Sequence, residues 1–254
     1  MSEHFLKHKQ DGVLTVRLNR PDKKNALTSE MYSGLAAALD ETADGSDLRC
    51  LLVLGVPGAF TAGNDIADFL NTAMTGKRAS NAVFDFLERI IMAKKPVVAG
   101  VDGLAIGVGA TMLMHCDHVV ASDQSFFKTP FVDLGVLPEA GSSLIAPRIM
   151  GHHLAFELLA MGETFDAAKA HEAGLVNKVV PSAELETAAR EAAARIAAKP
   201  PEALAQARAL VRGDRSDVLA RMREEAELWK ERLSSDEAKA AFMAFMAKGQ
   251  KKAS

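Results

Sequence analysis

The 254-residue sequence is poor in cysteine and in excess charge of either sign. Its two cysteines, Cys50 and Cys116, are too few for a disulfide framework and lack zinc-site spacing, which is typical of buried thiols in a reducing compartment. The formal net charge is −3, from 30 Lys plus Arg against 33 Asp plus Glu. Nucleic acids and anionic membrane surfaces require clustered positive charge, so we expect neither as a partner.

Long apolar runs are also lacking. The most apolar window, 97–114, is interrupted by Asp102 and four glycines, and no apolar stretch follows a basic N-terminal head. The sequence therefore predicts no membrane span and no secretion signal, and we expect a cytoplasmic protein. With 48% hydrophobic residues, the chain can form one large domain, with or without a smaller appendage.

Strand and helix patterns alternate through the first part of the chain. Apolar and polar residues alternate over 14–18, which predicts a half-buried strand. Apolar residues recur every four positions after Thr28, a suitable N-cap, and predict a helix that ends before Gly45. Further strands are predicted at 48–54, 96–101, 118–121 and 175–180, and further helices at 83–92 and 108–115. This order is typical of an α/β protein built from crossover units.

Beyond Pro181 the sequence is rich in Ala, Glu, Arg and Lys at helical spacing. Amphipathic helices are predicted at 185–197, 202–211, 218–233 and 236–248. Helices so rich in alanine bury little area alone and need a partner surface. We therefore divide the chain into a core, 1–181, and a C-terminal helical region, 182–254, which we expect to make oligomer contacts.

Two loops rich in small residues follow predicted buried strands, at 59–66 and 102–110. Small residues at a strand-to-helix junction let a ligand approach the free backbone N–H groups of a helix start. Together the loops are suited to a two-amide anion hole, although the same glycines also suit tight turns.

Other motif interpretations fail on this sequence. Gly107-Val108-Gly109 begins a dinucleotide fingerprint that Met112 breaks, and serine-hydrolase, Walker and zinc-protease motifs are missing. The segment 115–118 contains His, Cys, Asp and His, but it straddles a helix-to-strand junction, so we expect no metal site. Glu139 follows Pro138 at a predicted helix start, where an acid usually just complements the helix dipole.

Taken together, these segments resemble the crotonase superfamily of enoyl-CoA hydratases and isomerases, over about 13–248. The matching motifs are Leu18-Asn19-Arg20-Pro21, Asn25-Ala26-Leu27, Ala62-Gly63-Asn64-Asp65, Lys95-Pro96-Val97, 103–109, Cys116-Asp117, Leu134-Gly135 and Ala173-Gly174-Leu175-Val176. The resemblance implies an α/β fold, a crotonase-like spiral of ββα units, with a C-terminal helical trimerisation region. It makes 1–181 an acyl-CoA-binding core, and the chain a homotrimer or a dimer of trimers.

The resemblance also implies roles for residues. The thioester oxygen of an acyl-CoA would lie between the backbone amides of Asn64 and Val108, which stabilise the negative oxygen of an enolate. Coenzyme A is part of this substrate, and no separate cofactor is expected. The implied substrate contacts are Lys24, Ala26, Ala62, Gly63, Asp65, Ile66, Gly107 and Phe131.

Departures from the family pattern favour one reaction. Hydratases of the family use two glutamates, and Thr111 and Phe131 stand at those positions here. Glu139 falls where peroxisomal-type Δ3,Δ2-enoyl-CoA isomerases carry their single catalytic glutamate, and its apolar neighbours are expected to raise its pKa toward neutrality. We therefore predict a Δ3,Δ2-enoyl-CoA isomerase. An enoyl-CoA hydratase, another crotonase-type lyase or hydrolase, and a non-catalytic acyl-CoA-binding scaffold remain alternatives, with Asp65, Asp68 and Asp133 as alternative acids.

Overall fold

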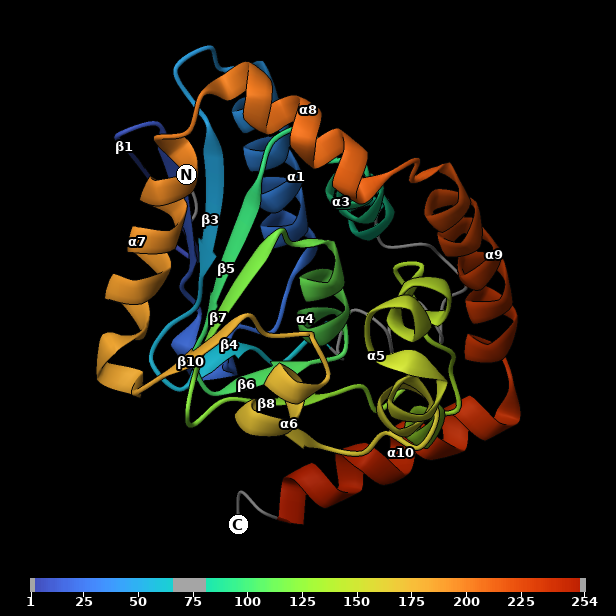
Figure 1. Ribbon diagram of the computed structural model, residues 1–254. Helices are drawn as coiled ribbons and strands as arrows, with labels where there is room; N and C mark the ends of the chain where they lie inside the picture. Colours follow the sequence, from blue (N-terminus) through green and yellow to red (C-terminus); the bar gives the residue numbers. More distant parts are fainter. Residues whose placement is uncertain (1–2, 66–80, 252–254) are drawn as a thin grey trace.

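The computed structural model describes residues 3–65 and 81–251 (Figure 1). The strands are β1 (Phe5–Gln10), β2 (Val13–Leu18), β3 (Cys50–Leu54), β4 (Ala59–Thr61), β5 (Val97–Val101), β6 (Leu104–Ile106), β7 (His118–Ser122), β8 (Phe126–Lys128), β9 (Phe165–Asp166) and β10 (Lys178–Val180). The helices are α1 (Ser29–Asp44), α3 (Ala82–Ile91), α4 (Val108–Thr111), α5 (Ser142–Leu159), α6 (Ala167–Glu172), α7 (Leu185–Ala197), α8 (Pro201–Arg212), α9 (Ser216–Leu233) and α10 (Asp236–Lys251).

Within the described residues, the larger sheet has six strands, in the order β1-β2-β3-β5-β7-β10. β1 pairs antiparallel with β2, and the remaining neighbours are parallel. β3 and β5 are buried along their whole length, as their continuous apolar sequences require. α1 packs on one face of the sheet and α7 covers the other, so apolar side chains are buried on both sides (Figure 1).

The smaller sheet positions the candidate site. Its strands, among the described residues, follow the order β4-β6-β8-β9, with β4, β6 and β8 parallel. The segments 62–65, 107–111 and 129–135 leave the carboxyl ends of β4, β6 and β8 respectively. Because the carboxyl ends of parallel strands meet at one edge of a sheet, these three segments lie together there.

The structure confirms the longer predicted elements and corrects several others. The segments 59–66 and 102–110, predicted as loops, contain β4 and β6, and β1, β8 and β9 were not predicted either. β4, β6 and β8 have three residues each, too few to show a two-residue period. The predicted helix 108–115 is α4 followed by the 3-10 turn η2 (Met112–His115).

The prediction that Glu139 begins a helix is wrong. α5 begins at Ser142, and the two residues between them, Ala140 and Gly141, have φ angles of +64° and +69°. These left-handed conformations are incompatible with a continuous right-handed helix. Glu139 therefore lies in the loop that leads into α5.

The C-terminal helices α8, α9 and α10 run around the outside of the molecule (Figure 1). α8 buries none of its own residues. α7, which we grouped with them from the sequence, instead packs its alanine face on β3, β5 and β7. The division at 181/182 stays a prediction. None of the described helices is long and apolar enough to cross a membrane.

Candidate active site

Gly63 brings the first two loops of the site into contact. Its φ is +85°, and a Cβ atom at this position would lie 2.7 Å from the carbonyl oxygen of Ile106. Only glycine fits both conditions without displacing the main chain. The loop after β4 therefore lies directly on the backbone that leads from β6 into α4.

Two backbone N–H groups at this contact are free. Among the residues that the structure describes, the N–H groups of Asn64 and Val108 have no hydrogen-bond partner. The neighbouring amides are engaged: the N–H of Leu27 donates to Gly63 O at 2.7 Å, and that of Asp65 donates to Leu27 O at 3.1 Å. Val108 is the first residue of α4, where the amide is free and the helix dipole is positive. Both groups thus keep an unused hydrogen-bond donor at the contact between the two loops.

Glu139 contacts the same short helix. Its Oε1 accepts a hydrogen bond from the Oγ1 hydroxyl of Thr111, a fully buried residue of α4. Burial raises the pKa of Glu139 to about 7; the hydrogen bond from Thr111 opposes this rise, and the charge of Glu225 adds to it. A carboxyl group with a pKa near 7 can accept and return a proton at neutral pH.

Tyr32 is a member of the site that the sequence analysis missed. Its hydroxyl donates to the side-chain Oδ1 of Asn64, and the residue is only 1% exposed. Burial and the charge of Glu139 raise the pKa of Tyr32 well above its ordinary value, so the phenol stays protonated. In the sequence, Tyr32 is the single tyrosine and lies on the apolar face of the predicted helix, a position that by itself indicates only core packing.

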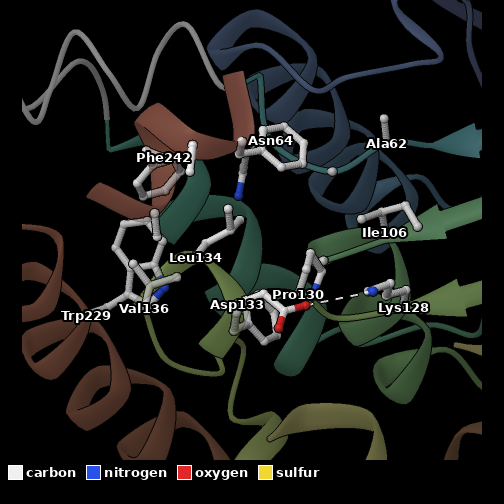
Figure 2. Close-up of a pocket in the computed structure, with 16 residues that line it drawn as sticks. Ala62, Asn64, Ile106, Lys128, Pro130, Asp133, Leu134, Val136, Trp229 and Phe242 are labelled. Carbon is white, nitrogen blue, oxygen red and sulfur yellow. Dashed lines mark ion pairs between the residues drawn. The ribbon is translucent and has the colours of Figure 1, made fainter. Parts of the chain in front are cut away.

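A cavity of about 640 Å3 opens beside these loops (Figure 2). It is lined by Ala62, Gly63, Asn64, Ile106, Gly107, Lys128, Pro130, Phe131, Asp133, Leu134, Val136, Trp229, Ala241, Phe242, Ala244 and Phe245. Most of this lining is apolar, and α9 and α10 supply part of it. An ion pair of 3.8 Å between Lys128 Nζ and Asp133 Oδ2 stands on one wall (Figure 2).

Five of the predicted site residues line this cavity, namely Ala62, Gly63, Asn64, Gly107 and Phe131. Val108 and Glu139 are not part of its lining. Val108 is fully buried next to Gly107, and Glu139 reaches the same helix, α4, through Thr111.

The segment 24–27, which contains the predicted substrate contacts Lys24 and Ala26, pairs through its backbone with the loop after β4. The N–H of Ala62 donates to the carbonyl oxygen of Lys24 at 2.9 Å, which places 24–27 alongside 62–65. The carboxylate of Asp65 lies 2.7 Å from Arg20 Nη1, which also donates to Ala26 O at 3.0 Å. Asp65 is therefore tied to the loop of Ala26. Ile66 lies outside the described residues. In 3–65 and 81–251 no group of three or more His, Cys, Asp or Glu is placed to hold a metal ion.

Comparison with known proteins identifies one family. The model of the family described as enoyl-CoA hydratase/isomerase matches residues 8–253. Enoyl-CoA delta isomerase 2 of Rattus norvegicus is 33% identical over 98% of this chain, and the match covers 65% of that protein. Short-chain-enoyl-CoA hydratase of Clostridium acetobutylicum is 33% identical over 94% of this chain and 93% of its own length. Both reaction names thus occur at the same level of similarity.

Solved structures have the same architecture. Pseudomonas aeruginosa OdaA superimposes with a TM-score of 0.91 at 40% identity, covering 96% of this chain and 99% of its own. An enoyl-CoA hydratase/isomerase from Pseudoalteromonas atlantica T6c also gives a TM-score of 0.91, at 36% identity, covering 96% and 97% of the two chains. The predicted α/β crotonase-like fold, with C-terminal helices, is confirmed.

Proposed function

Because the chain belongs to the enoyl-CoA hydratase/isomerase family, we propose that it shifts a double bond from C3 to C2 of an enoyl-CoA. One observation carries this proposal: the carboxyl of Glu139 has a pKa raised to about 7 and lies against α4, the helix that begins with the free amide of Val108. The proposed proton acceptor therefore contacts the same short helix that carries a proposed oxyanion donor.

The proposed reaction uses one carboxylate. Glu139 takes a proton from C2 of a 3-enoyl-CoA, and the electron pair of that C–H bond moves into the thioester, forming a dienolate. The backbone N–H groups of Asn64 and Val108 donate to the negative oxygen. Glu139 then returns the proton to C4, the double bond forms between C2 and C3, and the carboxylate is regenerated. Coenzyme A enters only as part of the substrate.

Two residues of the site argue against water addition. Adding water requires one group to activate the water and another to manage the second proton. The resemblance places hydratase glutamates at Thr111 and Phe131. In this structure the hydroxyl of Thr111 donates to Glu139, and Phe131 is a wall of the cavity.

Two of the three alternative acids form ion pairs. Asp65 pairs with Arg20 at 2.7 Å, and Asp133 with Lys128 at 3.8 Å. Asp68 lies outside the described residues. Glu139, whose pKa is raised to about 7 and which contacts α4 through Thr111, is the base that we propose.

The test is the turnover of 3-enoyl-CoA thioesters of several chain lengths, followed by formation of the conjugated 2-enoyl thioester. The Glu139→Gln variant is expected to lower kcat/KM by about 10²–10⁴, the contribution of a positioned general base. Glu163→Gln is the matched control: it makes the same substitution at an exposed glutamate that follows α5, and it is expected to keep the parent rate.

Three outcomes would contradict the proposal. The first is a Glu139→Gln enzyme within about tenfold of the parent. The second is hydration of 2-enoyl-CoA without double-bond migration, which would favour a hydratase. The third is binding of every thioester without conversion, which would favour a scaffold.

A further inference from the structure

The turn that follows Glu139 is held in an unfavourable conformation. Ala140 and Gly141 both have positive φ angles, +64° and +69°. A non-glycine residue such as Ala140 adopts this region only when its surroundings enforce it. Gly141 cannot be replaced easily, because a Cβ there would lie 2.7 Å from Val218 Cγ1 and 2.9 Å from Val218 O on α9.

Glu225 of α9 holds one side of this turn. Its Oε2 accepts the N–H of Gly141 at 2.6 Å, and its Oε1 accepts the N–H of Ser143 at 3.0 Å. The residue is 5% exposed. Two N–H donors from one helix start, each on its own oxygen, match a carboxylate anion, and hydrogen bonds of this charged kind are stronger than neutral ones.

His115 holds the other side. Its Nε2 lies 2.8 Å from Ala140 O, and its Nδ1 lies 2.8 Å from Arg215 Nη2. A guanidinium can only donate and a carbonyl oxygen can only accept, so His115 carries its proton on Nε2 and donates it to Ala140. Burial and the positive charge of Arg215 lower the pKa of His115 to about 3, so this ring is neutral. The turn is thus fixed by side chains more than 20 residues away on either side in sequence.

We propose that Glu225 is a positioning residue that holds the Ala140–Gly141 turn, so that the carboxyl of Glu139 stays against Thr111 and faces the thioester. This inference rests on the proposed role of Glu139 as the base. Glu225 also acts through its charge, which adds to the burial that raises the pKa of Glu139. The other groups that face this pair are Tyr32 from α1, Thr111 from α4 and Arg221 beside Glu225 on α9.

The test is Glu225→Gln, which keeps the size of the side chain but removes its charge and turns an NH2 group toward one of the two backbone donors. We expect kcat to fall by about 10- to 100-fold with little change in KM, because a small misplacement of a reacting group has that effect. The pKa of Glu139 should fall as well, since a neighbouring negative charge is lost. Glu227→Gln, at an exposed residue of the same helix, is the control and should change neither quantity.

A second readout separates this inference from the proposed reaction. The pKa of Glu139 can be followed without substrate, by carbon-13 NMR of protein labelled in its glutamate carboxyls, with the signal assigned by its loss in Glu139→Gln. If the enzyme does not isomerise 3-enoyl-CoA but the pKa of Glu139 falls in Glu225→Gln, the reaction is wrong and the influence of Glu225 on the Glu139 carboxyl stands. If the pKa stays in place, the inference is overturned whatever the reaction.

The same measurements distinguish a purely structural role of Glu225, in which it stabilises the fold without placing Glu139. A Glu225→Gln protein with a lower Tm but the parent kcat and the parent pKa of Glu139 would show that Glu225 only caps α5. Should Glu225→Gln fail to fold, Glu225→Asp keeps the charge and shortens the reach. It is then expected to lose part of kcat while the pKa of Glu139 remains close to its parent value; a fully active Glu225→Asp enzyme would overturn the inference.

Discussion

At the scale of single residues, the carboxyl of Glu139 is set by opposing influences. Burial and the charge of Glu225 favour the protonated acid, and the hydroxyl of Thr111 favours the anion. The resulting pKa of about 7 leaves both forms populated near neutral pH. A base that must give its proton back at the end of each turnover needs this balance.

The pH dependence follows from the same balance. A base acts as its anion, so kcat/KM is expected to rise with pH and reach half its plateau at about 7. Thr111→Val removes the hydrogen bond that lowers the pKa of Glu139, and the profile should move to higher pH by about one to two units. The measurement is the pH profile of kcat/KM for 3-enoyl-CoA.

The control for this prediction is Ser142→Ala. The Oγ of Ser142 is buried and has no hydrogen-bond partner among the described residues, so its removal should leave the profile in place. A Thr111→Val profile that coincides with the parent profile would show that the hydroxyl of Thr111 does not tune Glu139.

At the scale of the elements, three short parallel strands place the site. β4, β6 and β8 end at one edge of the smaller sheet, and the loops that follow them carry Asn64, Val108 and Phe131. At Asn64 and Val108 the proposed active groups are the backbone amides. Their placement depends on the path of the main chain more than on the side chains at 64 and 108.

This dependence predicts that Gly63→Ala is severe. A Cβ at Gly63 would lie 2.7 Å from Ile106 O, so the loop of Asn64 must shift away from the backbone that leads from β6 into α4. Loss of one oxyanion donor is expected to lower kcat by about 10²–10³. The measurement is kcat for 3-enoyl-CoA, with folding checked by circular dichroism.

Gly58→Ala is the matched control. Gly58 also has a positive φ, +76°, but a Cβ there would meet nothing within 4 Å. Both variants therefore share the backbone strain, and only Gly63→Ala carries the steric clash. If both variants lose activity equally, strain rather than displacement of the amide is the cause.

At the scale of the whole molecule, the C-terminal helices expose large apolar side chains. Leu210 and Val211 of α8 are 85% and 87% exposed. Adjacent apolar side chains exposed to this degree are typical of an interaction surface. The oligomeric contacts expected from the sequence remain a prediction, and α8 is where we expect them.

We expect the protein to be a homotrimer, or a dimer of trimers, when its mass is measured by analytical ultracentrifugation. Leu210→Asp combined with Val211→Asp should shift it toward the 27.1 kDa monomer, because two charges would be buried in the contact. Glu202→Ala, at an exposed position of the same helix, should leave the mass unchanged. A parent protein that sediments as a monomer at micromolar concentration would contradict this expectation.

The residue patterns predicted the α/β class, the strands of the larger sheet other than β1, and the loop that carries Asn64, whereas Glu139 was wrongly expected to begin a helix. Local periodicity and a family motif are both written in consecutive residues, which is why they could be predicted. The smaller sheet was not predictable in this way, because strands of three residues have no visible period and form only when paired.

The surroundings of the base depend on contacts between distant parts of the chain. Tyr32 reaches Asn64 across 32 positions, and Glu225 reaches Gly141 across 84. No local pattern joins residues so far apart, and each contact exists because the packing of α1 and α9 leaves a buried polar group that must find a partner. The left-handed turn after Glu139 has the same origin, since α9 and His115 hold it in a conformation that Ala140 would not adopt by its own preference.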